Sequence, residues 1–213
     1  MIRSIWLALP KAGSALALFM SAVSLPAHAT LVSLDVTLAD PSFPLTYSDT
    51  VAVADGKEIF PGNPTNIGQA QVFGSSLLLA NEYVDAQPSN RIVLGLEAGS
   101  GDNTGYGAGA SYLFSNLRFG TPSIITDVDV SLDNIDGVTK GTQVVFGPHS
   151  VQVFIDTLTI PQFRDACISD AQCGTITLDL IVQQVPEPGA CVLLLAGIGI
   201  VGIIARRRGR DSS

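Results

Sequence analysis

Apolar and polar residues alternate along most of the middle of the chain. The pattern is clearest at residues 32–38, 124–132 and 176–182, where apolar side chains recur at nearly every second position. Successive side chains of a β-strand point to opposite faces, so this period predicts strands with one buried face and one wet face. Val32 and Ile124 are among the side chains expected on the buried face. Shorter runs predict five further strands, at residues 71–79, 92–97, 111–119, 142–146 and 151–158.

Turn-forming residues separate these runs, for example at residues 61–64, at residues 133–137 and at Gly147-Pro148. No stretch between them shows the 3.6-residue apolar period of a helix. Eight or nine such strands predict an all-β body at residues 30–184, folded as an antiparallel, jelly-roll-like β-sandwich. The glycine-rich residues 99–109 lack the Lys-Ser/Thr of a phosphate-binding loop and are expected to form a flexible surface loop.

The first 29 residues have the layout of a secretory signal peptide. Arg3 and Lys11 precede an apolar run at residues 12–25, and Ala27-His28-Ala29 follows as a small-x-small cleavage site. We therefore predict cleavage between Ala29 and Thr30, so that the mature, secreted chain begins at Thr30. The alternative is an uncleaved membrane anchor, for which the apolar run is short.

The C-terminus contains a short apolar segment followed by a cluster of arginines. Residues 190–205 predict a transmembrane helix, and Arg206, Arg207 and Arg208 follow as a cytoplasmic stop, which leaves the body on the outer side of the membrane. Sixteen helical residues at about 1.5 Å each span roughly 24 Å, less than the ~30 Å hydrocarbon core. So short a helix suits a segment that is held briefly and then released by an enzyme.

A Pro-Glu-Pro triplet precedes this helix at Pro186, Glu187 and Pro188, and it forms a rigid joint because neither proline can continue a strand or lie inside a helix. With the helix and the arginines it makes residues 185–210 resemble the PEP-CTERM sorting signal of Gram-negative bacteria that make exopolysaccharide. The resemblance implies that exosortase, an integral membrane enzyme, recognises the triplet and processes the chain. It also implies a route from the inner membrane, facing the periplasm, to the cell surface or extracellular matrix.

Charge is segregated between the ends and the middle of the chain. Six of the eleven basic residues lie in the two terminal segments, so that residues 30–185 carry five basic and seventeen acidic residues, a net charge of −12. So acidic a body repels the phosphates of nucleic acid and of anionic lipids. Binding to nucleic acid is therefore excluded as a function.

Two groups of acidic residues could carry chemistry. Asp127 and Asp129 lie two apart on one predicted strand, with Cα atoms about 6.6–6.8 Å apart, near the carboxylate separation of an inverting glycosidase. The same alternation places both on the wet face, which explains them without catalysis. Asp133 and Asp136 could supply oxygen ligands to Ca²⁺, although their spacing departs from that of an EF-hand loop. We expect no catalytic residue and no cofactor, with Ca²⁺ at this turn as the alternative.

Cysteine and histidine usage gives one further prediction. Cys167 and Cys173 bracket five residues, and in an oxidising periplasm they are expected to form a disulfide. His149 is the only histidine after signal-peptide removal. One histidine and scattered cysteines do not assemble a tetrahedral zinc site.

Sugar binding is the alternative function for an envelope protein of this kind. The only tryptophan, Trp6, belongs to the signal peptide, which leaves four tyrosines to stack on sugars: Tyr47, Tyr83, Tyr106 and Tyr112. The leading hypothesis is a non-enzymatic envelope or matrix protein sorted by exosortase, with exopolysaccharide as a possible partner. The alternatives are a carbohydrate-binding or glycan-cleaving module, and a plain inner-membrane anchored protein that keeps its tail.

Overall fold

The computed structural model describes residues 29–42, 45–99, 102–163, 167 and 171–185. Within these ranges the chain is all-β, as predicted, and every regular element is a strand. The strands are β1 (Leu31–Asp40), β2 (Leu45–Ala52), β3 (Gln71–Val72), β4 (Ser75–Ser76), β5 (Tyr83–Gln87), β6 (Arg91–Glu97), β7 (Ser111–Phe119), β8 (Ser123–Asp133), β9 (Val144–Gly147), β10 (Ser150–Phe154) and β11 (Cys173–Gln184).

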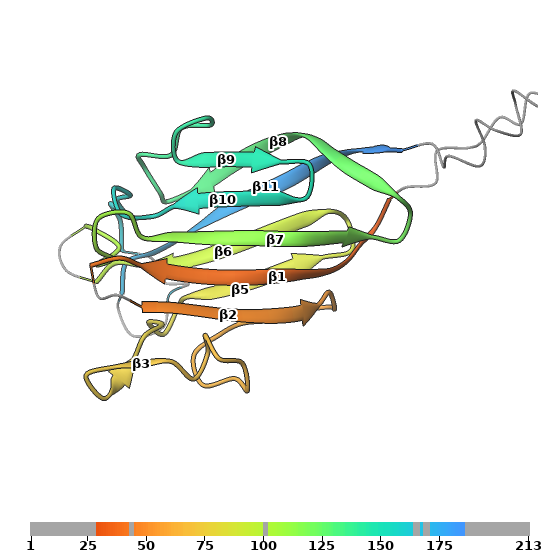
Figure 1. Ribbon diagram of the computed structural model, residues 1–213. Helices are drawn as coiled ribbons and strands as arrows, with labels where there is room; N and C mark the ends of the chain where they lie inside the picture. The colour runs from red at the N-terminus through yellow and green to blue at the C-terminus, as the bar shows by residue number, and fades with distance from the viewer. Residues whose placement is uncertain (1–28, 43–44, 100–101, 164–166, 168–170, 186–213) are drawn as a thin grey trace, which may run out of the picture.

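The strands form two larger antiparallel sheets and one short ribbon (Figure 1). The five-stranded sheet has the order β2-β1-β7-β10-β9, and the four-stranded sheet has the order β5-β6-β11-β8. Three hairpins, β1–β2, β5–β6 and β9–β10, stay within one sheet, whereas the chain changes sheet between β6 and β7, β7 and β8, β8 and β9, and β10 and β11. The ribbon β3–β4 lies in the long connection from β2 to β5.

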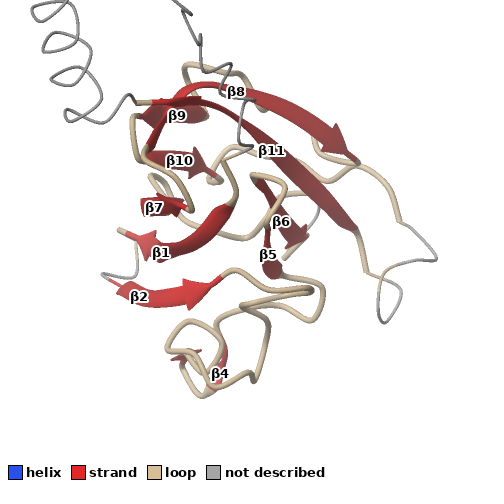
Figure 2. Cartoon of the chain, turned by 90° about the vertical axis from the view of Figure 1, so that its right-hand side faces the viewer, coloured by secondary structure: helices blue, strands red, loops and turns tan. Residues whose placement is uncertain are grey.

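Both large sheets supply side chains to one hydrophobic cluster, and Figure 2 shows them as two layers. The five-stranded sheet contributes Leu34, Val36 and Phe114, and the four-stranded sheet contributes Leu94 and Leu178, all of which are at most 1% exposed. The prediction that the apolar residues of the alternating runs are buried is therefore confirmed at most positions. Every second residue of these strands faces the other sheet.

Two strands escaped prediction because their sequences alternate poorly. In β2 an acid, Asp49, occupies an inward-facing position, and its carboxylate accepts hydrogen bonds from the backbone N–H groups of Asn66 and Ile67 at 2.7 and 2.8 Å. In β5 only two apolar side chains, Val84 and Ala86, face inward. Conversely, the run at residues 71–79 contains only the short strands β3 and β4.

The expected faces of Val32 and Ile124 are wrong, and β-bulges explain both errors. The pairing of β1 with β7 shifts register between Leu31 and Ser33, so that Leu31 is buried and Val32 is 50% exposed. The pairing of β8 with β11 skips Thr126, so that Ile125, rather than Ile124, is the buried residue. An extra residue in one strand of a pair reverses the faces beyond it.

The first and last described residues lie at the same end of the molecule, on the right in Figure 1. The Gly120 N–H donates to the Thr30 carbonyl at 2.8 Å, and the Val185 N–H donates to the Pro122 carbonyl at 2.9 Å, so that one turn holds both ends. Ala29 is buried, and its carbonyl oxygen accepts a hydrogen bond from the side-chain amide of Asn90. No helix of the described ranges is long and apolar enough to cross a membrane, and the helix predicted at residues 190–205 lies outside those ranges.

The predicted disulfide is confirmed: Cys167 and Cys173 are bonded, with their Cα atoms 5.9 Å apart. Cys173 is the first residue of β11, so the bond ties the preceding loop to one of the two inner strands of the four-stranded sheet. By loop-closure entropy, so short a loop contributes about 2–2.5 kcal/mol of stability.

Gly95 provides a test of the cross-strand packing. It lies opposite Tyr83 in the β5–β6 pair, and a Cβ atom added to it would lie 2.2 Å from Cε1 of the Tyr83 ring. Gly95→Ala should therefore lower the free energy of unfolding by about 1–3 kcal/mol, the usual cost of overpacking. In a Tyr83→Ala background the same change should cost less than about 1 kcal/mol. Urea unfolding measures both costs, and equal costs would contradict this account of the contact.

Candidate functional site

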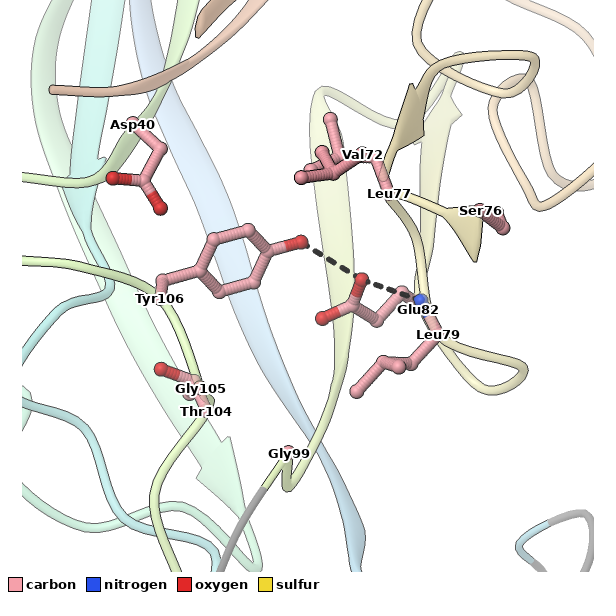
Figure 3. A pocket seen from close by; sticks show the side chains of 10 residues that line it. All are labelled: Asp40, Val72, Ser76, Leu77, Leu79, Glu82, Gly99, Thr104, Gly105 and Tyr106. Atoms are coloured by element: carbon pink, nitrogen blue, oxygen red, sulfur yellow. Dashed lines mark hydrogen bonds between the residues drawn. The ribbon is translucent and has the colours of Figure 1, made fainter. Parts of the chain in front are cut away.

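The best-formed cavity among the described residues lies beside the β3–β4 ribbon (Figure 3). It has a volume of about 180 Å³. Three apolar residues, Val72, Leu77 and Leu79, line it together with polar residues that include Asp40, Glu82 and Tyr106. Asp40 ends β1, whereas Thr30 precedes that strand, so the cavity and the chain ends lie at opposite ends of the molecule.

The glycine-rich connection between β6 and β7 carries Tyr106 into the cavity. Part of this connection is packed rather than a flexible surface loop, since Thr104 is 2% exposed and its hydroxyl donates to the Ile155 carbonyl at 2.8 Å. Asp40 fixes it to β1, because the Asp40 carboxylate accepts the Gly107 N–H at 3.0 Å. A Cβ atom at Gly107 would lie 2.1 Å from Oγ of Ser42, so this approach requires glycine.

Glu82 is the most unusual residue of the cavity. It is only 1% exposed, and its Oε2 accepts hydrogen bonds from the Leu79 N–H at 2.9 Å and from the Tyr106 hydroxyl at 2.8 Å. Its Oε1 is also buried but has no hydrogen-bond partner among the described residues. Figure 3 shows this second oxygen pointing into the space between Tyr106 and Leu79.

Burial, with a smaller contribution from the nearby charge of Glu97, raises the pKa of Glu82 to about 8. The two donors to Oε2 and the backbone N–H of Glu97 oppose this shift without cancelling it. Burial also raises the pKa values of the Tyr106 and Tyr112 hydroxyls well above 10, and the charge of Glu82 adds to both shifts. At neutral pH the cluster is therefore an uncharged carboxylic acid beside two uncharged phenols.

The proton of neutral Glu82 belongs on Oε1, because Oε2 already accepts two hydrogen bonds. The cavity therefore contains a buried O–H group with no protein acceptor among the described residues. A buried donor without an acceptor costs free energy that a suitable ligand or an ordered water can recover. The cavity with its buried O–H group is therefore a candidate binding site.

The acid pair that the sequence offered for catalysis lies elsewhere, on β8. Asp127 forms an ion pair with Lys140, and the hydrogen bond from Lys140 holds the pKa of Asp127 below its usual value. Asp129 is exposed and lies opposite Asp179 of β11, which binds Arg91. None of these residues lines the cavity of Glu82.

The turn considered for Ca²⁺ is occupied by structural hydrogen bonds. The Asn134 side-chain amide donates to the carbonyls of Gln162 and Cys173 at 2.7 and 2.8 Å, and the backbone of Asp136 pairs with Thr159. Across the described part of the chain, no group of three or more His, Cys, Asp or Glu side chains could hold a metal ion. Asp133 and Asp136 thus have no third acidic ligand in that part.

The histidine and the tyrosines have different surroundings. His149 is exposed in the turn between β9 and β10. Tyr112 is buried in the core. The Lys57 ammonium lies over the ring of Tyr83, with Nζ 3.8 Å from the ring centroid. Of the tyrosines considered for sugar stacking, Tyr106 is the one that lines the cavity. Sequence reasoning missed Glu82, whose only signal is an acid that follows the apolar residues 77–80 after one intervening residue, Asn81.

The buried carboxyl predicts a measurable pH dependence of stability. Its pKa is raised on folding, so the stabilisation is complete below about 4.5, the unfolded value, and is lost as the pH rises towards about 8. Wild-type protein should therefore lose on the order of 3–5 kcal/mol more stability than Glu82→Gln between pH 5 and 8.5. Urea unfolding at both pH values measures this difference. Asp129→Asn, at an exposed position, is the control and should behave as wild type.

The residues predicted for export and sorting lie at or beyond the limits of the described chain. Ala29 is buried, and Thr30 is exposed directly before β1. The triplet Pro186, Glu187 and Pro188, and the arginines Arg206, Arg207 and Arg208, lie outside the described residues.

Comparison with known proteins bears on this C-terminal segment. No curated protein and no solved structure is significantly similar to the chain. Residues 184–208 match the family model of the PEP-CTERM protein-sorting motif, which agrees with the resemblance of residues 185–210. The chain therefore carries a PEP-CTERM protein-sorting motif at its C-terminus, which marks it as a protein sorted by exosortase.

Proposed function

We propose that this protein is an exported, non-catalytic component of the cell envelope or of its extracellular polysaccharide matrix. In this proposal a jelly-roll-like β-sandwich body follows a cleaved signal peptide, and exosortase processes the tail. The observation that carries the proposal is the sorting motif at residues 184–208. Two antiparallel sheets that share one hydrophobic cluster support the sandwich assignment.

The placement of the chain ends supports a tethered and then released body. Val185, at the start of the matched sorting motif, leaves the fold next to Pro122, at the same end as Thr30. The ten residues of β1 separate this end from Asp40 and the cavity, a distance of roughly 30 Å at ~3.3 Å per residue. A body held by its C-terminus would thus present the cavity away from the point of attachment.

A carbohydrate-binding module is the second candidate, and the cavity with its buried donor favours it. Glycan cleavage is less well supported, because a general acid needs a raised pKa and the pKa of Asp127 is lowered by Lys140. Glu82 has a raised pKa, and the carboxylate of Asp40, which lines the same cavity, is held by the backbone N–H groups of Ser42 and Gly107.

The sorting proposal predicts a truncated C-terminus in native cells. Mass spectrometry of the mature protein should find a chain that lacks Arg206–Arg208, because exosortase processes the tail near the Pro-Glu-Pro triplet. Replacing Pro186, Glu187 and Pro188 by alanine should leave the arginines in place and retain the protein in the inner membrane.

Pro88→Ala is the matched control, since Pro88 is exposed in the β5–β6 turn and lies far along the chain from the triplet. This variant should be processed as wild type. An intact tail in wild-type cells would favour the plain inner-membrane anchor, and unchanged processing of the alanine variant would remove the role of the triplet.

Asp127→Asn and Asp129→Asn test the cleavage alternative. Both side chains lie on the exposed face of β8, so each variant should unfold at nearly the same urea concentration as wild type. Binding and turnover on a glycan array should equal those of wild type. A loss of glycan turnover in either variant would instead support a glycosidase.

A further inference from the structure

We propose that the cavity lined by Glu82 and Tyr106 binds an acetamido group, the uncharged secondary amide carried by acetylated amino sugars and other acetylated amines. This inference deepens the proposed matrix role by naming a chemical group that the body would hold. It concerns the body only, so its failure would leave the sorting proposal intact.

The donor is the Oε1 side of Glu82. The Leu79 N–H and the Tyr106 hydroxyl both bind Oε2, which fixes the orientation of the carboxyl group and directs Oε1 towards the cavity (Figure 3). Glu82 is 1% exposed, and Oε1 has no hydrogen-bond partner among the described residues. A ligand carbonyl oxygen would accept the Oε1 proton and satisfy this buried group.

The walls of the cavity suit a small group with an apolar end. Val72, Leu77 and Leu79 line the cavity, and its volume of about 180 Å³ is similar to the ~150 Å³ of an engineered cavity that binds benzene. An acetamido group with its methyl is smaller than benzene and fits such a space. The cavity therefore suits recognition of a substituent on a larger molecule.

The remaining polar groups of the cavity are mostly acceptors. The Asp40 carboxylate accepts one backbone N–H on each oxygen, from Ser42 and Gly107, and each oxygen retains a further lone pair. The hydroxyl of Thr104 already donates to Ile155. An amide N–H thus finds acceptors in the same cavity in which the Glu82 O–H meets the amide carbonyl.

The charges around the site select against anionic ligands, and the pH dependence of binding separates a cation from an uncharged amide. The acids Asp40 and Glu97 disfavour an anion, and the neutral forms of Tyr106 and Tyr112 offer it no compensation. A cation would draw the proton from Glu82 and would bind more tightly as the pH rises. An uncharged amide should instead bind more weakly as the pH rises, because its carbonyl oxygen needs the proton of Glu82.

Isothermal titration calorimetry on the full chain in detergent tests the proposal. N-acetylglucosamine is the probe, N-methylacetamide is the minimal group, and glucose and glucosamine are the matched controls. N-acetylglucosamine should bind at least ten-fold more tightly than glucose at pH 6.5, and N-methylacetamide should compete with it. Its affinity should fall about ten-fold by pH 9, when roughly a tenth of Glu82 remains protonated.

Two variants separate the binding role of Glu82 from its structural role. Glu82→Gln retains an N–H donor towards the cavity, so its affinity should stay within about three-fold of wild type and lose its pH dependence. Glu82→Leu removes the donor and should abolish binding. Circular dichroism checks that both variants fold.

Several outcomes would overturn the proposal. These are equal binding of glucose, preferential binding of glucosamine that strengthens with pH, a pH dependence that persists in Glu82→Gln, or no saturable binding of any probe. In the last case Glu82 would be a turn residue hydrated by water. If N-methylacetamide binds but N-acetylglucosamine does not, the acetamido group is confirmed and a sugar source is rejected.

Discussion

The fold depends on the burial of one face of each large sheet against the other. β1 and β11 carry much of this burial, because each has a neighbour on both sides and places three or more fully apolar side chains in the shared cluster. The outward faces of these two strands bear acids and hydroxyl groups, which are solvated by water. The exposed loops, the cavity and the chain ends are all positioned by this common core.

Strand identity could be predicted from the sequence where alternation is long and regular, as in β11, whose inward residues Ile176, Leu178 and Leu180 are buried as expected. The prediction failed for β2, where a polar contact takes the place of an apolar one: the Asp49 carboxylate accepts hydrogen bonds from the backbone of a distant loop. It also failed at bulges, because the extra residue at Thr126 is set by pairing with β11 rather than by local composition. Neither the contact of Asp49 nor the bulge at Thr126 can be predicted from the sequence of one strand alone.

The cavity was unpredictable for a similar reason. Glu82, Tyr106 and Asp40 come from three segments separated by at least 24 residues in the chain, and none forms a motif with its neighbours. Glycines bring them together, since the connection after β6 approaches β1 closely only where a side chain is absent, as at Gly107. The sorting signal is the reverse case: it is contiguous, so its order of triplet, apolar run and arginines is legible without any fold.

The buried position of Ala29 constrains the timing of maturation. If a peptidase cuts after this residue, the bond must be cut while the chain is still extended, because in the finished fold Ala29 is 6% exposed and Asn90 holds its carbonyl oxygen. Leader removal would then come before the closure of β1 onto β7, and a precursor that had already folded should resist the peptidase. The order of the two events would be imposed by the protein itself.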